Sequence, residues 1–247
     1  MNKTRASILL LHLLFSTQLF AQWIEVEKNE FKQAILQSEK QMIEKSTYAY
    51  QTNYFFYELP TDQAPKLTYK GFIHCEQGKN FEIKQFDQLI VQNSQLNVTV
   101  DSIMKYVIIK DQDSLLYTRK TDFSYEDFMK SNCKVHRKKT NDGTSYLLEF
   151  PQNAKYRSAE ISFDKKGLVS RYELMAGQEV IDDTGEKEKN IQPKMEIRYS
   201  HYEFGPATWM KNKKVVADII EEREGLCYLS KAYSGYTLVD LRIKKEQ

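Results

Sequence analysis

Cysteine, glycine and proline are scarce in this chain of 247 residues, which contains 3 Cys, 9 Gly and 5 Pro. So few cysteines exclude a disulfide-dense scaffold, and so little glycine and proline excludes a collagen-like or low-complexity chain. Cys75, Cys133 and Cys227 leave two readings open. We favour three free, half-buried thiols over one disulfide with one thiol left over.

Motifs for metal, nucleophilic and phosphate chemistry are absent from the sequence. Neither Cys-x-x-Cys nor His-x-x-x-His spacing occurs, and there is no glycine-rich phosphate loop, so we expect no metal and no cofactor. Ser145 and Ser158 lie in no Gly-x-Ser-x-Gly elbow. His74 and Cys75 are adjacent, but neighbours on a strand point to opposite faces and cannot act on each other directly. We therefore expect no enzyme activity.

Beyond the N-terminus, no segment approaches the roughly 20 apolar residues of a membrane-spanning helix. Residues 8–15 are apolar but too short to span a bilayer, and they lie between the basic pair Lys3 and Arg5 and the small residue Ala21. This layout predicts that residues 1–21 are a cleaved export signal. Because no Cys stands at the junction, we expect a periplasmic protein that is neither a lipoprotein nor anchored by a transmembrane helix.

A large net charge is also lacking. The formal charge is +2, and removal of the predicted signal takes away Lys3 and Arg5 and no acid, which leaves a neutral chain. A neutral chain argues against a nucleic-acid partner, which favours a basic face. Basic clusters at residues 137–139 and 211–214 leave two readings open: peripheral contact with anionic lipid headgroups, or solvated strand ends.

The first predicted element of the exported chain is a helix over Asn29–Lys45. Phe31, Ile35 and Met42 fall on one apolar stripe of this helix, and charged residues fill the other side. A second, short helix is predicted over residues 124–131, where Ser124 begins a capping-box pattern.

Aromatic residues are plentiful, with 16 Tyr and 13 Phe, and many of them alternate with polar residues. Tyr48, Tyr50, Tyr54 and Phe56 share one side of a predicted strand over residues 47–58. Asn141-Asp142-Gly143 predicts a tight hairpin turn. The spacing of residues 215–220 permits a helix, but their β-branched content and the Glu224-Gly225 turn favour a hairpin with 226–230. Further strands are predicted over residues 67–75, 81–86, 89–91, 96–100, 104–110, 135–139, 145–150, 159–163, 168–175, 195–199 and 236–243.

These elements predict an α+β fold with one curled antiparallel sheet of about 10 or 11 strands. A sheet of this size must curl to bury a face, so we expect a half-barrel whose concave side is covered by the helices. We expect residues 22–204 to form this domain. Residues 205–247 are predicted to add a C-terminal β-hairpin extension of the same sheet.

The order of elements resembles the periplasmic carriers of outer-membrane lipoproteins, the LolA-like superfamily. The resemblance covers about residues 29–204. It rests on the first helix and on five later segments: Tyr48-Ala49-Tyr50, Gly71-Phe72-Ile73, Phe81-Glu82-Ile83, the strand pair Leu96–Ile109 split by Asp101, and Ile161–Leu168. Where the family often has Lys-Arg-Pro, this chain has Glu76-Gln77-Gly78, and Gln77 replaces the family's lid-closing Arg. The chain therefore resembles a divergent member with a changed lid.

The resemblance implies a hydrophobic concave surface that receives acyl chains under a helical lid. Phe31, Ile35 and Met42 would belong to the lid. For each lining residue, ordinary core packing remains the other reading. The lining predicted on this basis consists of Tyr48, Tyr50, Tyr54, Phe56, Phe72, Phe81, Ile83, Val98, Ile161 and Phe163.

Two functions remain open from the sequence. The first is a non-enzymatic periplasmic carrier that binds lipid or lipoprotein acyl chains by burying apolar surface. The second is a structural or adaptor subunit of a cell-envelope or secretion assembly, which would bind a protein partner through residues 205–247.

Overall fold

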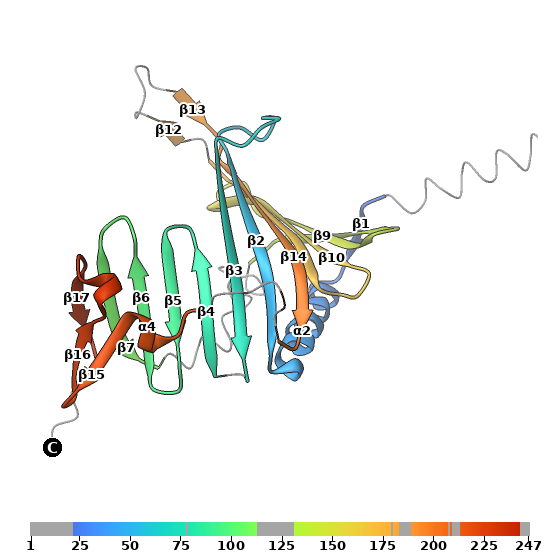
Figure 1. Cartoon of the computed structure of the whole chain (residues 1–247). Coiled ribbons are helices and arrows are strands. Elements are labelled where there is room, and N and C mark those ends of the chain that lie inside the picture. The colour runs from blue at the N-terminus through green and yellow to red at the C-terminus, as the bar shows by residue number, and fades with distance from the viewer. Residues whose placement is uncertain are drawn as a thin grey trace, which may run out of the picture. The chain divides into compact units, whose positions relative to one another are not determined.

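The computed structural model describes residues 22–77, 79–112, 131–178, 180–182, 189–206, 208 and 213–242. The predicted signal and nearly all of the predicted helix at 124–131 lie outside these residues. The strands are β1 (Ile24–Val26), β2 (Tyr48–Tyr57), β3 (Leu67–Glu76), β4 (Asn80–Gln85), β5 (Gln88–Gln92), β6 (Leu96–Asp101), β7 (Tyr106–Asp111), β8 (Lys134–Thr140), β9 (Gly143–Glu149), β10 (Tyr156–Asp164), β11 (Val169–Ala176), β12 (Val180–Asp182), β13 (Lys189–Ile191), β14 (Lys194–Phe204), β15 (Ile220–Arg223), β16 (Leu226–Leu229) and β17 (Thr237–Asp240) (Figure 1).

One large sheet contains 13 of the strands, in the order β1-β8-β9-β10-β11-β14-β2-β3-β4-β5-β6-β7-β17. β17 runs parallel to β7, and the other pairs of this sheet whose register is described are antiparallel. The predicted α+β class with one large, open antiparallel sheet is confirmed. The predicted count of 10 or 11 strands is too low. The strand of this sheet that no predicted range covers is β1, whose three residues give no readable alternation.

The predicted hairpin at residues 141–143 is confirmed. Thr140 pairs with Gly143, so Asn141 and Asp142 form a two-residue turn between β8 and β9. Gly143 has a φ of +151°, and a Cβ at this position would lie 1.9 Å from the carbonyl oxygen of Phe163. Glycine is therefore required here by backbone conformation and by the close approach of β10.

The segment left open at residues 215–220 contains both alternatives. It forms one helical turn, α4 (Val216–Ile219), and then strand β15, which pairs with β16 in a separate two-stranded sheet. The Val215 N–H donates to the Asp218 carboxylate at 2.9 Å, and burial of Val216 and Ile219 favours the turn over their β propensity. After the short helix η3 (Lys231–Tyr233), β17 joins the large sheet.

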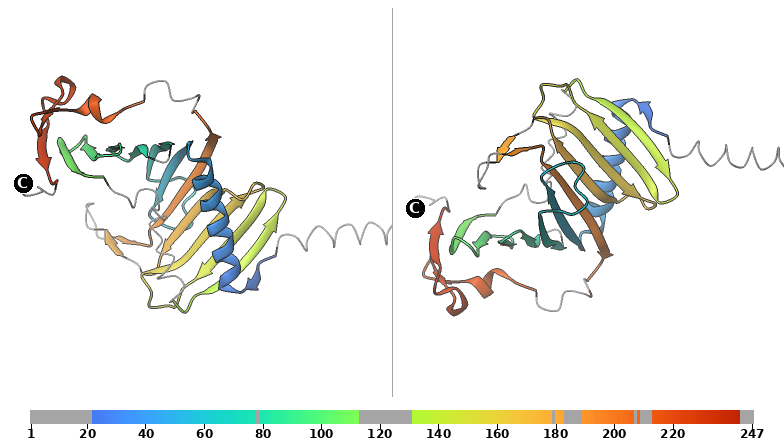
Figure 2. Two further views of the ribbon diagram at one scale, coloured as in Figure 1. Left: turned by 90° about the horizontal axis from the view of Figure 1, so that it is seen from below. Right: turned by 90° about the horizontal axis from the view of Figure 1, so that it is seen from above.

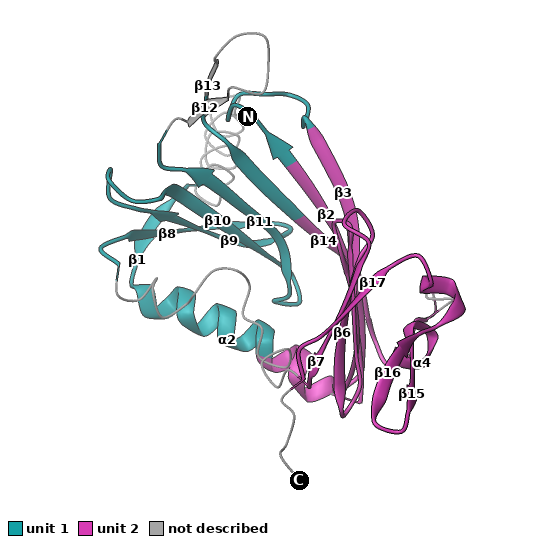
Figure 3. Ribbon diagram, turned by 90° about the vertical axis from the view of Figure 1, so that its left-hand side faces the viewer, with its two compact units in different colours: residues 1–39, 56–66, 124–197 teal, residues 40–55, 67–123, 198–247 magenta. Residues whose placement is uncertain are grey.

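The chain divides into two compact units, and the division passes through β2 and β14 (Figure 3). Unit 1 comprises Met1–Glu39, Phe56–Lys66 and Ser124–Ile197. Unit 2 comprises Lys40–Phe55, Leu67–Phe123 and Arg198–Gln247.

In unit 1, the predicted first helix is α2 (Lys28–Lys45), which lies across the strands β8 to β10 (Figure 2). The Phe31 ring lies 5.4 Å from the Tyr146 ring, measured between centroids. Arg137 donates to Glu30 at 2.8 Å, and Tyr146 donates to the same carboxylate at 3.1 Å. Contacts of both kinds fix the helix on this face of the sheet.

In unit 2, one face of β5, β6 and β7 forms an apolar core under the C-terminal elements (Figure 2). Val98, Val107 and Ile109 pack there against Val216 and Ile219. The sequence also predicts that residues 104–110 are covered on both faces. This prediction is wrong at the start of the segment, where the side chains of Met104 and Tyr106 are exposed.

Candidate ligand-binding sites

Four of the predicted lining residues lie on β2 and share one of its faces by alternation, Tyr48, Tyr50, Tyr54 and Phe56. The rings of Tyr48 and Tyr50 stack at 6.3 Å, and Tyr50 also lies 5.0 Å from Tyr202 of β14. Burial raises the pKa of Tyr48 and of Tyr50 well above the ordinary tyrosine range. The result is a half-buried tyrosine cluster in unit 2 with neutral hydroxyl groups.

Strand register separates the predicted residues of β3, β4 and β6. Ile73 pairs with Ile83, whereas the neighbouring Phe72 pairs with Lys84, so Phe72 and Ile83 lie on opposite faces. Phe81 shares the face of Ile83. Val98 falls on the other face, because it pairs with Val91, which pairs with Glu82. The structure thus places Phe72 and Val98 apart from the other lining residues of these strands.

Ile161 and Phe163 lie in unit 1, where they belong to the packed layer beneath α2. Phe31 is fully buried, and the Tyr146 ring beneath it lies 5.9 Å from the Phe163 ring. Burial together with the neighbouring Glu30 carboxylate raises the pKa of Tyr146 to about 12. Ile35 of α2 is half-buried. These contacts are close packing, as in an ordinary core.

The remaining lid residue, Met42, is half-buried and falls in the part of α2 that belongs to unit 2. The structure therefore does not bring all of the predicted lining and lid residues to one surface. Their role as ligand contacts stays a prediction.

The opposite face of the sheet in unit 1 carries a mixed set of side chains that alternation places away from α2. Register puts Glu149, Ser158 and Met175 side by side across β9, β10 and β11. The next row contains Leu147, Glu160 and Glu173. Polar and apolar side chains are therefore adjacent on this face, unlike the apolar face under the helix.

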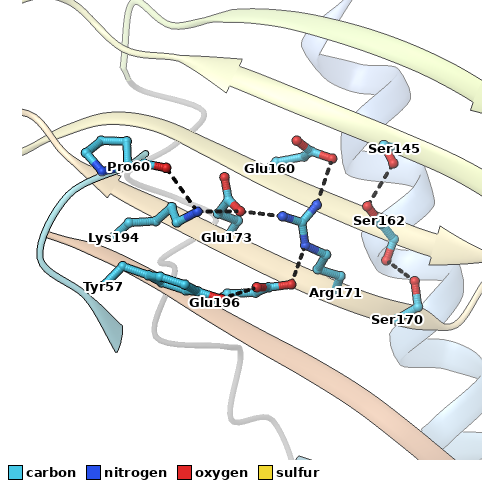
Figure 4. A network of polar contacts seen from close by, with 10 residues as sticks. All are labelled: Tyr57, Pro60, Ser145, Glu160, Ser162, Ser170, Arg171, Glu173, Lys194 and Glu196. Atoms are coloured by element: carbon cyan, nitrogen blue, oxygen red, sulfur yellow. Dashed lines mark hydrogen bonds and ion pairs between the residues drawn. The ribbon is translucent and has the colours of Figure 1, made fainter. Parts of the chain in front are cut away.

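Arg171 of β11 is the centre of a charged network on this polar face (Figure 4). Its guanidinium donates to Glu196 at 2.7 Å and contacts Glu173, and it lies 3.5 Å from Glu160. Glu196 also accepts from the Tyr57 hydroxyl at 3.2 Å. One arginine thus links three carboxylates from β10, β11 and β14.

Lys194 adds a second positive charge to this network. Its amine lies 3.8 Å from Glu173 and 4.3 Å from the centre of the Tyr57 ring. Burial lowers the pKa of Arg171, but Glu173 and Glu196 outweigh it and raise that pKa above the ordinary value. Burial raises the pKa of Glu160, although Arg171 opposes the shift. Because each of these charges is paired, we interpret the network as a structural link between β10, β11 and β14 and not as a reactive site.

Beside this network the same face carries an open hollow of about 650 Å³. Its apolar lining comes from Leu147, Phe150 and Met175, which are all half-buried. Polar groups converge around these three side chains. The other lining residues are Pro60, Thr61, Glu149, Arg157, Ser158 and Gln192. A concave, mainly apolar surface with a few polar groups is the usual form of a small-ligand site.

This hollow was not predicted from the sequence. Its lining comes from strands β9, β10 and β11 and from two loops, and only the strand register brings Glu149, Ser158 and Met175 together. The sequence does show that Leu147 and Glu149 share the face of this strand opposite to an apolar face. A mixture of polar and apolar side chains is typical of any solvent-exposed face, so it does not indicate a binding site.

Other predicted features can be placed as well. His74 pairs with Glu82 and Cys75 with Phe81, so the adjacent His and Cys lie on opposite faces, as predicted. Cys75, Cys133 and Cys227 form no disulfide bonds. Within the described residues, no cluster of three His, Cys, Asp or Glu side chains has a geometry that could hold a metal ion.

The predicted basic clusters are partly neutralised. Arg137 is paired with Glu30 at 2.8 Å, and Lys213 lies 3.6 Å from Glu76. Lys211 lies outside the described residues. The structure thus favours ordinary surface pairing for Arg137 and Lys213.

Comparisons with known proteins give little. No protein-family model matches the chain, and no curated protein matches it. Among solved structures, the chain is similar to a candidate outer membrane lipoprotein-sorting protein domain from Vibrio parahaemolyticus. The identity is 14%, the match covers 72% of this chain and 92% of that chain, and the TM-score is 0.24.

Among the described residues, no helix combines the length and apolar character needed to cross a membrane.

Proposed function

We propose that this chain is a non-enzymatic binder of an amphiphile and that the hollow on the polar face of unit 1 is its binding site. The observation that carries the proposal is the pairing of an apolar lining, Leu147, Phe150 and Met175, with polar groups in one open hollow of about 650 Å³. That volume falls within the roughly 300–1,000 Å³ of typical small-ligand sites.

Apolar contact would supply most of the binding free energy, at about 0.8 kcal/mol for each CH₂ group removed from water. The Arg171 network would hold the neighbouring part of the sheet in place through Glu160 and Glu173. This arrangement suits a ligand with an alkyl chain and a polar head. A lipid or the acyl chain of a lipoprotein is the ligand that we propose, in the periplasm, where the predicted export signal would send the protein.

A fluorescent fatty-acid probe tests this function directly. We expect saturable binding to the purified chain, displacement by palmitate, and co-purifying lipid in native mass spectrometry. Leu147→Glu should weaken binding at least tenfold, because it puts a charge on the apolar lining. Leu67→Glu, at an exposed position of β3, is the matched control. A wild-type chain that binds neither probe nor lipid would rule the proposal out.

The tyrosine cluster on β2 is the competing location for the same ligand. Tyr50→Ser removes its central ring, whereas Leu147→Glu leaves that cluster untouched. If Tyr50→Ser abolishes probe binding and Leu147→Glu does not, the site lies on β2 and the hollow is not used. Thermal unfolding of both variants separates lost binding from lost folding.

A second function, an adaptor subunit, is favoured by the outer face of the β15–β16 hairpin. Leu226 and Tyr228 are 59% and 47% exposed there, while the alternating Cys227 and Leu229 pack inward. Exposed apolar side chains of this kind mark partner surfaces. A co-purification experiment in which the double variant Leu226→Ser, Tyr228→Ser loses a stable protein partner would support the adaptor. Unchanged partners would count against it.

A further inference from the structure

A second hollow, of about 210 Å³, lies within unit 2 and belongs to none of the surfaces above. Its base is formed by β3 and β4, where His74, Glu76 and Glu82 point to the same face by register and alternation. The segment before and within α4 forms its other wall. Val91 and Val216 supply apolar lining, and Lys213 and Lys214 stand at the same wall.

Two polar atoms in this hollow lack a hydrogen-bond partner. His74 and Glu82 pair across β3 and β4 and are each 4% exposed. Among the described residues, neither His74 Nε2 nor Glu82 Oε2 has a partner. A buried polar atom without a partner loses the hydrogen bonds that it makes to water in the unfolded chain, so two neighbouring ones call for an explanation. Both line the hollow, and a bound molecule there would satisfy them.

The charges around the hollow are balanced. Lys213 lies 3.6 Å from Glu76, and a backbone hydrogen bond from Lys214 reaches the Glu82 carboxyl group. The two lysines oppose a bound cation, and the two carboxyl groups oppose a bound anion. Burial lowers the pKa of His74 and raises that of Glu82, so the site resists a net charge of either sign.

We propose that this hollow binds a small, neutral, hydroxyl-rich ligand of the size of a polyol or a single sugar ring. A hydroxyl group can donate to one acceptor and accept from one donor, which matches an imidazole nitrogen beside a carboxyl oxygen. Its C–H groups would contact Val91 and Val216. The volume of about 210 Å³ far exceeds the roughly 10–15 Å³ that one water molecule needs, so a single bridging water leaves most of the space unfilled.

Saturation-transfer NMR on the full chain tests the ligand class. The probes are D-glucose and glycerol, with acetate and ethylammonium as small charged controls. We expect transfer to glucose or glycerol at millimolar concentration and none to either ion. We also expect the ¹⁵N signal of His74 Nε2 to shift on addition of whichever neutral probe shows transfer. Transfer to an ion alone, or no transfer and no shift with either neutral probe, would overturn the proposal.

Two polar variants locate the site. Glu82→Gln and His74→Gln each replace one of the two unpartnered groups by an amide, which changes its donor and acceptor pattern, and each should weaken binding of the neutral probe about tenfold. Glu27→Gln, at an exposed position of unit 1, should leave it unchanged. If both site variants fold and bind as the wild type does, the ligand lies elsewhere and the assignment fails. A crystal soaked in glucose that shows only ordered water between His74 and Glu82 would also overturn it. Because this hollow lies in unit 2, its failure leaves the amphiphile proposal untouched.

Discussion

At the scale of single residues, the buried side chains of His74 and Glu82 make the free energy of unfolding depend on pH in opposite directions. The folded state lowers the pKa of His74, so the unfolded chain binds its proton more readily as the pH falls below about 6.5. Glu82 behaves the other way. Its pKa is raised by burial, so its contribution to stability is lost as the pH rises above about 4.3.

The first prediction concerns His74. His74→Gln removes the group that takes up a proton on unfolding, so the drop in unfolding free energy between pH 7 and pH 5 should be smaller in the variant than in the wild type. Urea unfolding at the two pH values measures this drop. His201→Gln, at an exposed position of β14, is the control for the substitution itself. An identical drop in wild type and His74→Gln would contradict the prediction.

The second prediction concerns Gly143. Gly143→Ala places a Cβ against the Phe163 carbonyl at a φ that alanine rarely adopts, so we expect a loss of about 2 kcal/mol or more in unfolding free energy. Gly235→Ala is the matched control, because nothing lies within 4 Å of a Cβ there. It should change stability by less than about 0.5 kcal/mol. Chemical denaturation compares the two, and equal effects would show that the β8–β9 turn tolerates a side chain.

At the scale of elements, α2 differs from the movable lid that the resemblance implies. Phe31 is fully buried against Tyr146, and Glu30 accepts hydrogen bonds from both Arg137 and Tyr146. A helix that lifts from the sheet must break these contacts. The start of α2 therefore behaves as part of the core of unit 1.

The third prediction tests that conclusion. Phe31→Ala should lower the unfolding free energy by about 3–5 kcal/mol, because it leaves a cavity in a packed site. Ile43→Ala lies on the same helix but at a side chain that is 62% exposed, so it should have little effect. Urea denaturation gives both free energies of unfolding. A small effect of Phe31→Ala would mean that the helix is only loosely docked.

The fourth prediction concerns the network that joins β10, β11 and β14. Arg171→Met removes the cation that pairs with Glu160, Glu173 and Glu196, so we expect a loss of about 2 kcal/mol at pH 7.5 after allowing for the partial exposure of Arg171. The deficit should shrink at pH 4.5, because burial raises the pKa of Glu160 and Arg171 no longer opposes that shift. Denaturant titrations at both pH values measure it. A deficit independent of pH would point to lost packing instead.

At the scale of the whole molecule, the fold was predictable where local pattern and long-range packing agree. The turn at Asn141 and Asp142 and the alternation of β2 are examples. β1 escaped prediction because Ile24–Val26 is too short to show a period and is defined by its pairing with β8. α4 escaped because Val216 and Ile219 favour strand locally, and only burial selects the helical turn.

The candidate sites were less predictable than the fold. Successive side chains on a strand point to opposite faces, so a shift of one residue in register moves a side chain to the other face. For this reason Phe72 and Val98 lie on the face opposite to Phe81 and Ile83, although all four were predicted to line one surface. His74 and Glu82 carry no motif. They become a pair only because β3 and β4 align in one register.

The fifth prediction concerns residues 205–247, which the sequence analysis treats as an extension. Val216 and Ile219 pack on Val98, Val107 and Ile109, so a chain ending at residue 204 should expose that apolar face and aggregate. Ile219→Ser should destabilise the full-length chain strongly, whereas Leu226→Ser, at an exposed position, should not. Size-exclusion chromatography and thermal unfolding check both statements. A monomeric, cooperatively folded truncation would show that residues 22–204 are self-sufficient.

The residues that cover the apolar face of β5, β6 and β7, among them Val216 and Ile219, lie far downstream of these strands in the sequence. During synthesis this apolar face therefore stays exposed until the last part of unit 2 has been translated. If the chain is exported as proposed, late burial of this face would leave unit 2 unfolded for longer, which suits passage through a translocation channel. The exposed apolar face would also make the incomplete chain a substrate for chaperones that prevent aggregation.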